Sequence, residues 1–167
     1  MACAAGGYFT VGVEVRMEAS DFSDTQQQMV TSAELDARKA LKIPNDMPPA
    51  EIVATIHAFV AEQRDRWYRR GLRDDQKIAL SAFYAASIVH AHGWEWQSFK
   101  TKDGVRIGVT DPDRKWVVLP TVMFKQLFKL GVDKAKVTPV GLFAAIGEGK
   151  LPDTLNGSLT VISDCKG

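Results

Sequence analysis

The sequence predicts an α+β fold, in which N-terminal helices pack on a three- to five-stranded antiparallel meander that is followed by two short helices. Residues 92–120 predict the meander, because aromatic and β-branched residues fall there in three short runs separated by turn residues. Apolar spacing of three and four residues on both sides of this stretch is typical of amphipathic helices. The composition, with 46% hydrophobic and 25% charged residues, is that of a globular chain, and we expect one domain over residues 1–167.

The first residues allow two interpretations. Residues 8–17 alternate apolar and polar side chains, so residues 1–20 can supply an edge strand of the meander. Alternatively, Met17 marks the natural start and the residues before it are an upstream extension. Residues 18–28 are polar and predict an irregular lead-in in either case.

Two helices are expected next. Thr31 and Glu34 fit a capping box, in which a hydroxyl and a carboxylate satisfy each other's backbone amides, so a short helix should begin there and end near Leu41. Prolines at 44, 48 and 49 separate it from a second helix over residues 49–70, because proline lacks a backbone donor and is best tolerated in the first turn of a helix.

The remaining helices are predicted from the residues that can cap their starts or end them. Asp74 can cap a third helix, which Gly93 should end, and Thr121 and Thr138 can cap two short helices after the meander. Residues 158–163 predict a short strand that covers a sheet edge. The apolar positions of the third helix are expected on one face: Ile78, Ala79, Ala82, Phe83, Ala86 and Val89.

Two turns divide the meander. Asp103 and Gly104 provide the positive φ of a tight hairpin, and at residues 111–113 a proline fixes φ before an aspartate that can bond its own backbone. Alternation predicts that the tryptophans of the meander pack beneath the helices. Any function of this stretch would then belong to its other face and its two charged turns. The tryptophans concerned are Trp94, Trp96 and Trp116.

Charge and composition limit the partners. A formal net charge of +1 provides no overall attraction for nucleic acid or an anionic membrane, and no apolar run approaches the roughly 20 residues of a membrane span. We expect a cytoplasmic protein without a membrane partner. Cys3 and Cys165 are expected to be free thiols, although neighbouring chain ends would also allow a bridge.

Two clusters of side chains resemble binding sites, one for nucleic acid and one for zinc, but each has a simpler structural explanation. Arginines around Trp67 and Tyr68 resemble a nucleic-acid surface, but cations at a helix C-terminus also complement its dipole, so nucleic acid is not expected. His90, His92 and Glu95 suit zinc by type, but helical residues two apart point in different directions. We therefore expect no metal, no cofactor and no catalytic residue. A small enzyme or ligand site built from these three residues remains the alternative function.

One block resembles a known group of proteins. An alanine-rich helix leads into Gly93-Trp94-x-Trp96, a strand carries the Asp111-Pro112 turn, and Val117-Val118-x-Pro120 ends a strand before a lysine-bearing helix. In these features residues 80–149 resemble a loosely defined group of small bacterial α+β domains of unknown function, some of which act as immunity proteins beside secreted-toxin genes. The match covers less than half of the chain and carries over no functional residue.

The expected function is therefore protein binding. The resemblance implies a soluble interaction domain that binds and neutralises a bacterial toxin or secreted effector, in a one-to-one complex of roughly 1,600 Å². The predicted contacts are charges around the meander, because turns project from a rigid sheet. They are Glu95, Arg106, Asp111, Asp113 and Arg114.

Overall fold

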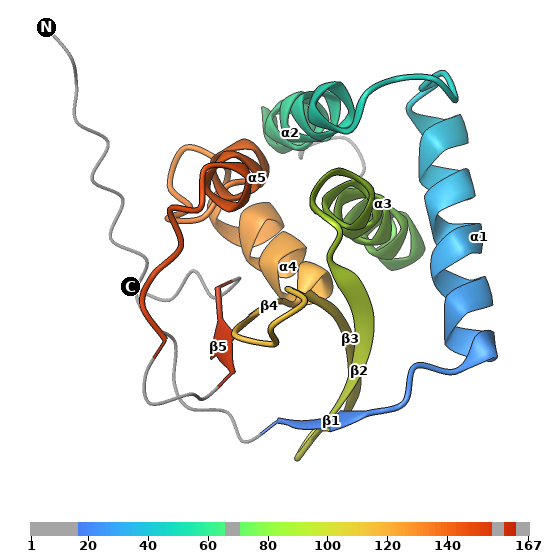
Figure 1. The fold of residues 1–167 in the computed structure, drawn as a ribbon. Helices are drawn as coiled ribbons and strands as arrows, with labels where there is room; N and C mark the ends of the chain where they lie inside the picture. Colours follow the sequence, from blue (N-terminus) through green and yellow to red (C-terminus); the bar gives the residue numbers. More distant parts are fainter. Residues whose placement is uncertain (1–16, 66–70, 155–158, 163–167) are drawn as a thin grey trace, which may run out of the picture.

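The computed structural model describes residues 17–65, 71–154 and 159–162, with only the backbone for Arg64 and Asp65. The described residues form five helices and one five-stranded sheet, which confirms the expected α+β class (Figure 1). In chain order the elements are β1 (Glu18–Ser20), α1 (Asp24–Ala40), α2 (Pro49–Asp65), α3 (Asp74–His92), β2 (Glu95–Thr101), β3 (Gly104–Thr110), β4 (Trp116–Val118), α4 (Pro120–Leu130), α5 (Pro139–Gly147) and β5 (Thr160–Val161).

The N-cap of helix α1 lies eight residues earlier than predicted. Ser23 is its N-cap: the Gln26 amide donates to Ser23 Oγ (3.2 Å), and the Ser23 amide donates to Gln26 Oε1 (2.9 Å). Gln26 Nε2 also donates to Ser98 Oγ on β2, at 2.6 Å. The predicted capping box of Thr31 and Glu34 is wrong, because both residues lie inside α1 and the same Ser-x-x-Gln signature occurs upstream.

An edge strand, β1, replaces part of the expected irregular lead-in. It pairs antiparallel with β2, and Ala19 lies opposite Phe99. Just after β1, the ring of Phe22 stacks on that of Trp96 with centroids 6.0 Å apart. A strand of three mostly exposed residues has too few positions for an apolar alternation. The strand predicted over residues 8–17 lies outside the described residues, except for Met17.

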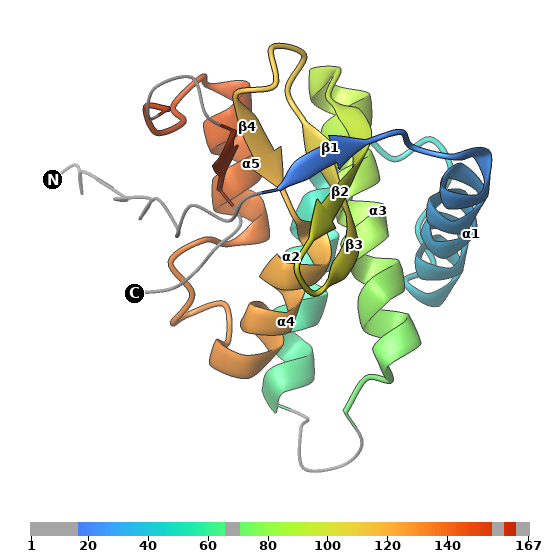
Figure 2. The same cartoon turned by 90° about the horizontal axis from the view of Figure 1, so that it is seen from below.

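Helix α3 is the centre of the fold. It contacts α1, α2, α4, α5 and β3, and Figures 1 and 2 show it between α1 and α4. Every residue from 79 to 88 is buried, so the expected single apolar face is wrong for this half of the helix. Ile78, which was predicted to be in the core, is 54% exposed. Gly93 ends α3 with a left-handed φ of 68°, as predicted.

The meander forms as predicted, and the sheet continues beyond it. β2, β3 and β4 pair antiparallel in sequence order. β5 pairs with β4 in parallel, so the sheet is mixed and the expectation of a wholly antiparallel sheet is wrong for this edge. Parallel pairing requires a long crossover, here made by α4 and α5, and strand pairing of this kind cannot be read from residues 158–163 alone.

The residues predicted to begin and end the two later helices do so in the structure, with one exception. Gly131 ends α4, and Thr138 Oγ1 accepts the Gly141 amide at the start of α5. Thr121 does not cap α4. Leu119 is the N-cap and Pro120 occupies the first turn, where its missing donor is not needed.

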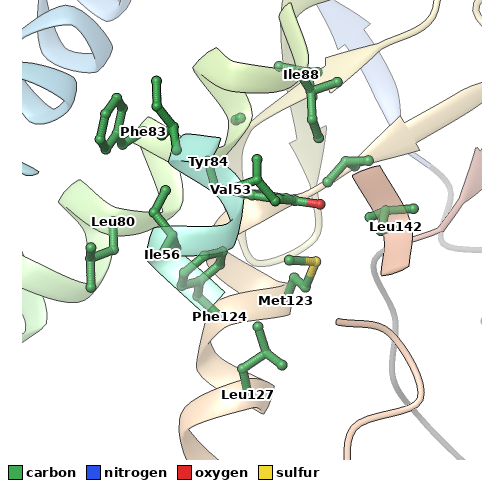
Figure 3. Packing of buried hydrophobic residues seen from close by; sticks show 14 of the residues in the cluster. Val53, Ile56, Leu80, Phe83, Tyr84, Ile88, Met123, Phe124, Leu127 and Leu142 are labelled. Carbon is green, nitrogen blue, oxygen red and sulfur yellow. The ribbon is translucent and has the colours of Figure 1, made fainter. Parts of the chain in front are cut away.

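Two apolar clusters lie on opposite faces of the sheet. The larger one fills the space among the helices (Figure 3), where Tyr84 packs on Phe124 with ring centroids 5.6 Å apart and donates to the Pro139 carbonyl at 3.1 Å. The tryptophans of the meander pack against this cluster, as predicted. The smaller cluster, centred on Phe99 and Val117, buries part of the face expected to be free for function.

Candidate functional site

The β3–β4 turn is held by one buried carboxylate. Asp111 Oδ1 accepts the backbone amides of Lys115 and Trp116, each at 2.7 Å, and Oδ2 accepts the amide of Asp113 at 3.2 Å. Asp111 is only 6% exposed, so the expectation that it projects towards a partner is wrong. The aspartate before the proline therefore bonds the backbone, whereas the one after it, Asp113, forms an ion pair with Lys115 at 3.3 Å.

The other predicted contacts do not form one surface. Glu95 and Arg114 are exposed at the end of the sheet that holds the β3–β4 turn, since Glu95 pairs in register with Thr110. Arg106 lies four residues back along β3, about 13 Å away at the usual strand rise. It is half-buried, and its guanidinium lies 4.0 Å from the carboxylate of Asp103 at the hairpin.

The histidines of the alternative site have different surroundings. The His92 ring packs 4.6 Å from the Phe143 ring of α5, and its buried Nε2 atom has no hydrogen-bond partner. Burial lowers the pKa of His92. His90 and Glu95 are exposed. Within the described parts of the chain, no three His, Cys, Asp or Glu side chains are placed to hold a metal ion, and no helix is long and apolar enough to cross a membrane.

Most of the arginine-rich cluster lies outside the described residues. Trp67, Tyr68 and three of the arginines lie outside the described residues, as do both cysteines. Of this cluster, Arg73 is described with its side chain, and it forms an ion pair with Asp75 at 2.9 Å.

A cleft separates α1 from the start of α3. Its volume is about 520 Å³, and we call it the α1–α3 cleft. Small side chains leave the space, since Ala33, Ala37 and Ala40 recur on the α1 wall at four- and three-residue spacing and Ala79 lies on the α3 side. Its other lining residues are Met29, Ser32, Asp36, Leu41, Phe59, Leu72, Arg73, Asp75, Gln76 and Leu80.

A second hollow lies on the other side of α3. The α3–α4 groove has a volume of about 420 Å³ and adjoins a smaller apolar pocket of about 90 Å³. Ile78, Ser81 and Thr121 line both hollows. The groove is completed by Asp74, Lys77, Phe124, Lys125 and Phe128, and the pocket by Met29, Val30, Ala33, Ala82, Trp96, Ile107 and Pro120.

Exposed apolar side chains gather around the α3–α4 groove and the apolar pocket. Ile78 is 54% exposed, Met29 of the pocket is 59% exposed, and Val105 is 60% exposed two residues before Ile107 on the same face of β3. Figure 2 shows α4, the N-terminal half of α3 and the β2–β3 hairpin at one end of the molecule, opposite the β3–β4 turn. The sequence did not predict this surface. Ile78 lies four residues before Ala82, which is buried, so helical spacing placed both residues on the core face.

Comparisons with known proteins do not extend this description. No family model, curated protein or solved structure matches the chain.

Proposed function

We propose that this chain is a protein-interaction domain that binds its partner through the α3–α4 groove and the adjoining apolar pocket. The observation that carries the proposal is the exposure of Ile78 between an apolar pocket and a groove that contains Phe124 and Phe128. Single exposed apolar residues are ordinary, but contiguous apolar surface is typical of binding sites. A partner that covers Ile78 would bury this surface at the centre of an interface, where apolar anchors contribute most.

The partner class follows from the resemblance of residues 80–149. A bacterial toxin or secreted effector, bound and neutralised in the cytoplasm, is the partner that this resemblance supports. The groove then replaces the charged β3–β4 turn as the predicted contact. The carboxylate of Asp111 already accepts backbone amides, and that of Asp113 already pairs with Lys115. Rim charges of that kind add little affinity by themselves.

The test compares two matched variants in a pull-down from the native host. Ile78→Asp places a charge in the proposed interface, whereas Leu35→Asp places one at a residue that is equally exposed, at 50%, but lines none of the three hollows. Ile78→Asp should lose a stoichiometric partner that Leu35→Asp retains, and should lose protection against the toxin encoded beside it. Equal retention by both variants would contradict the proposal.

A second candidate function, small-ligand binding, is favoured by the α1–α3 cleft. Its volume of about 520 Å³ is in the range of ligand sites, and its lining combines apolar side chains with a few polar groups such as Ser32, Asp36 and Gln76. None of His90, His92 and Glu95 lines it. Fragment screening by NMR tests this function: ligands should shift the resonances of Phe59 and Ala79, and a screen without such shifts would contradict it.

A further inference from the structure

The walls of the α3–α4 groove carry an excess of positive charge. Among its lining residues Lys77 and Lys125 face a single carboxylate, Asp74, which pairs with Lys77 at 3.1 Å. Lys125 is exposed and has no ion pair with any described residue. Lys129 lies one turn further along the same side of α4, also exposed, and α4 contains no acidic residue. The groove therefore presents at least one uncompensated cation along an apolar floor.

Apolar side chains form the floor of the groove. Phe124 is buried and Phe128 half-buried in the groove, and the ammonium of Lys77 lies 5.9 Å from the centre of the Phe128 ring. Ile78 forms the opposite wall. An apolar surface bordered by cations, Lys77 on α3 and Lys125 on α4, matches the two faces of an amphipathic segment that carries carboxylates.

Charge on the far side of Ile78 has the opposite sign. Helix α1, which lines the apolar pocket beyond Ile78, carries three acidic residues against Arg38 and Lys39, and one of the three, Glu34, lies 3.7 Å from Arg38. A bound segment would therefore meet a slight negative charge on α1 on one side and the lysines of α4 on the other, and its carboxylates should lie towards α4. Helix α4 has 11 residues and spans about 16 Å, the length of a partner helix of about three turns.

We propose, resting on the proposed function, that the α3–α4 groove binds an acidic amphipathic helix of the partner protein. Apolar residues of that helix pack against Ile78 and Phe128, and its carboxylates pair with Lys125 and Lys129. Such helix-in-groove recognition uses residues at three- and four-residue spacing as anchors. Exposed pairs at the rim set specificity and association rate, so binding weakens as salt rises.

The experiment is a display selection against the full chain. The library holds amphipathic helices of about three turns with a Leu or Phe stripe, and its polar positions encode Glu, Lys and Gln equally. Clones that bind the wild type and lose binding to Ile78→Asp are expected to contain more Glu than Lys. The double variant Lys125→Glu/Lys129→Glu should weaken these clones roughly tenfold at low salt and less at high salt.

The control variant is Arg114→Glu, which makes the same kind of charge reversal at a single residue at the opposite end of the sheet and should leave binding unchanged. Clones that depend on Ile78 but contain no excess of Glu would overturn this inference and leave the proposed function standing. If no clone depends on Ile78 and the native partner tolerates Ile78→Asp, both proposals fail. Binding of phosphatidylserine vesicles that depends on Ile78, without an acidic preference among the clones, would assign the groove to a membrane surface and overturn the inference.

Discussion

Helix α3 is covered to different extents at the two ends of the molecule. At the end that holds the β3–β4 turn, α3 is sealed: Ile88 is fully buried, Gly93 closes the helix and Asp111 satisfies three backbone amides. At the end that holds the β2–β3 hairpin, α3 extends between the α1–α3 cleft and the α3–α4 groove, and Ile78 is 54% exposed. Both ends contribute apolar residues to the core, but only the second also leaves a large apolar side chain of α3, Ile78, exposed.

The difference predicts which residues affect the free energy of unfolding and which affect the proposed partner binding. Groups at the sealed end have internal partners, so changing them should alter the free energy of unfolding. Ile78 at the open end retains half of its surface for solvent, so changing it should alter partner binding with little effect on folding. Four predictions, in order of decreasing effect, test this separation.

The largest effect is expected from truncating α3 at its sealed end. Ile88→Ala should lower the free energy of unfolding by about 3 kcal/mol, because it removes buried methyl groups and leaves a cavity. Ile78→Ala should cost less than about 1 kcal/mol, because the site is already half open to water. Urea denaturation of both variants measures the two values, and similar losses would refute the division of α3 into two halves.

The buried carboxylate of the β3–β4 turn comes next. Asp111→Ala should cost about 2 kcal/mol, because three backbone amides lose their shared acceptor. Asp113→Ala serves as the control and should change stability by less than about 0.5 kcal/mol, because its ion pair with Lys115 is exposed. Chemical denaturation checks both. A small effect of Asp111→Ala would mean that the sealed end does not depend on this network.

A smaller loss is expected at the hydroxyl of Tyr84. Burial raises the pKa of Tyr84 well above its ordinary value, so the phenol stays protonated and donates to the Pro139 carbonyl. Tyr84→Phe removes this donor without changing the packing and should cost about 1 kcal/mol. Thermal unfolding of the variant measures the loss, and an unchanged melting temperature would show that the bond between α3 and α5 adds nothing.

The smallest effect is a pH dependence at the last turn of α3. Burial lowers the folded-state pKa of His92 below that of the unfolded chain, so the unfolded state binds more protons at acid pH. The stability associated with neutral His92 should be complete above about pH 6.5 and should decrease as pH falls below it. Unfolding experiments across this range should show that His92→Leu reduces the dependence, whereas His90→Leu, at an exposed site, leaves it intact.

The sequence predicted the elements whose signals are local. Gly93, Gly131 and Thr138 mark helix ends correctly, because capping depends on a few neighbouring residues. The start of α1 was missed although it is also local, since Ser23 and Gln26 form a box of the same kind as the one assigned to Thr31. What distinguishes the two capping boxes is a tertiary contact, the hydrogen bond from Gln26 to Ser98.

The candidate site was less predictable for a physical reason. Its charged turn residues were identified by type, but burial decides whether a carboxylate such as Asp111 serves the backbone or a partner. The exposure of Ile78 depends on how closely α1 and α4 pack against α3, and helical spacing does not specify that packing. Hydrophobic periodicity reports which face of a helix is apolar, not which part of it is covered.

By itself, the sequence determined the α+β class, the three antiparallel strands and most helix ends, because strand alternation, turn residues and caps act over short distances. Only the tertiary structure decided the parallel pairing of β5, the burial of Asp111 and the position of the α3–α4 groove. Each of these arises where segments far apart in the chain meet. The space between Ile78 and Phe128 is lined by residues of both α3 and α4, so that geometry belongs to the packed helices and not to either helix alone.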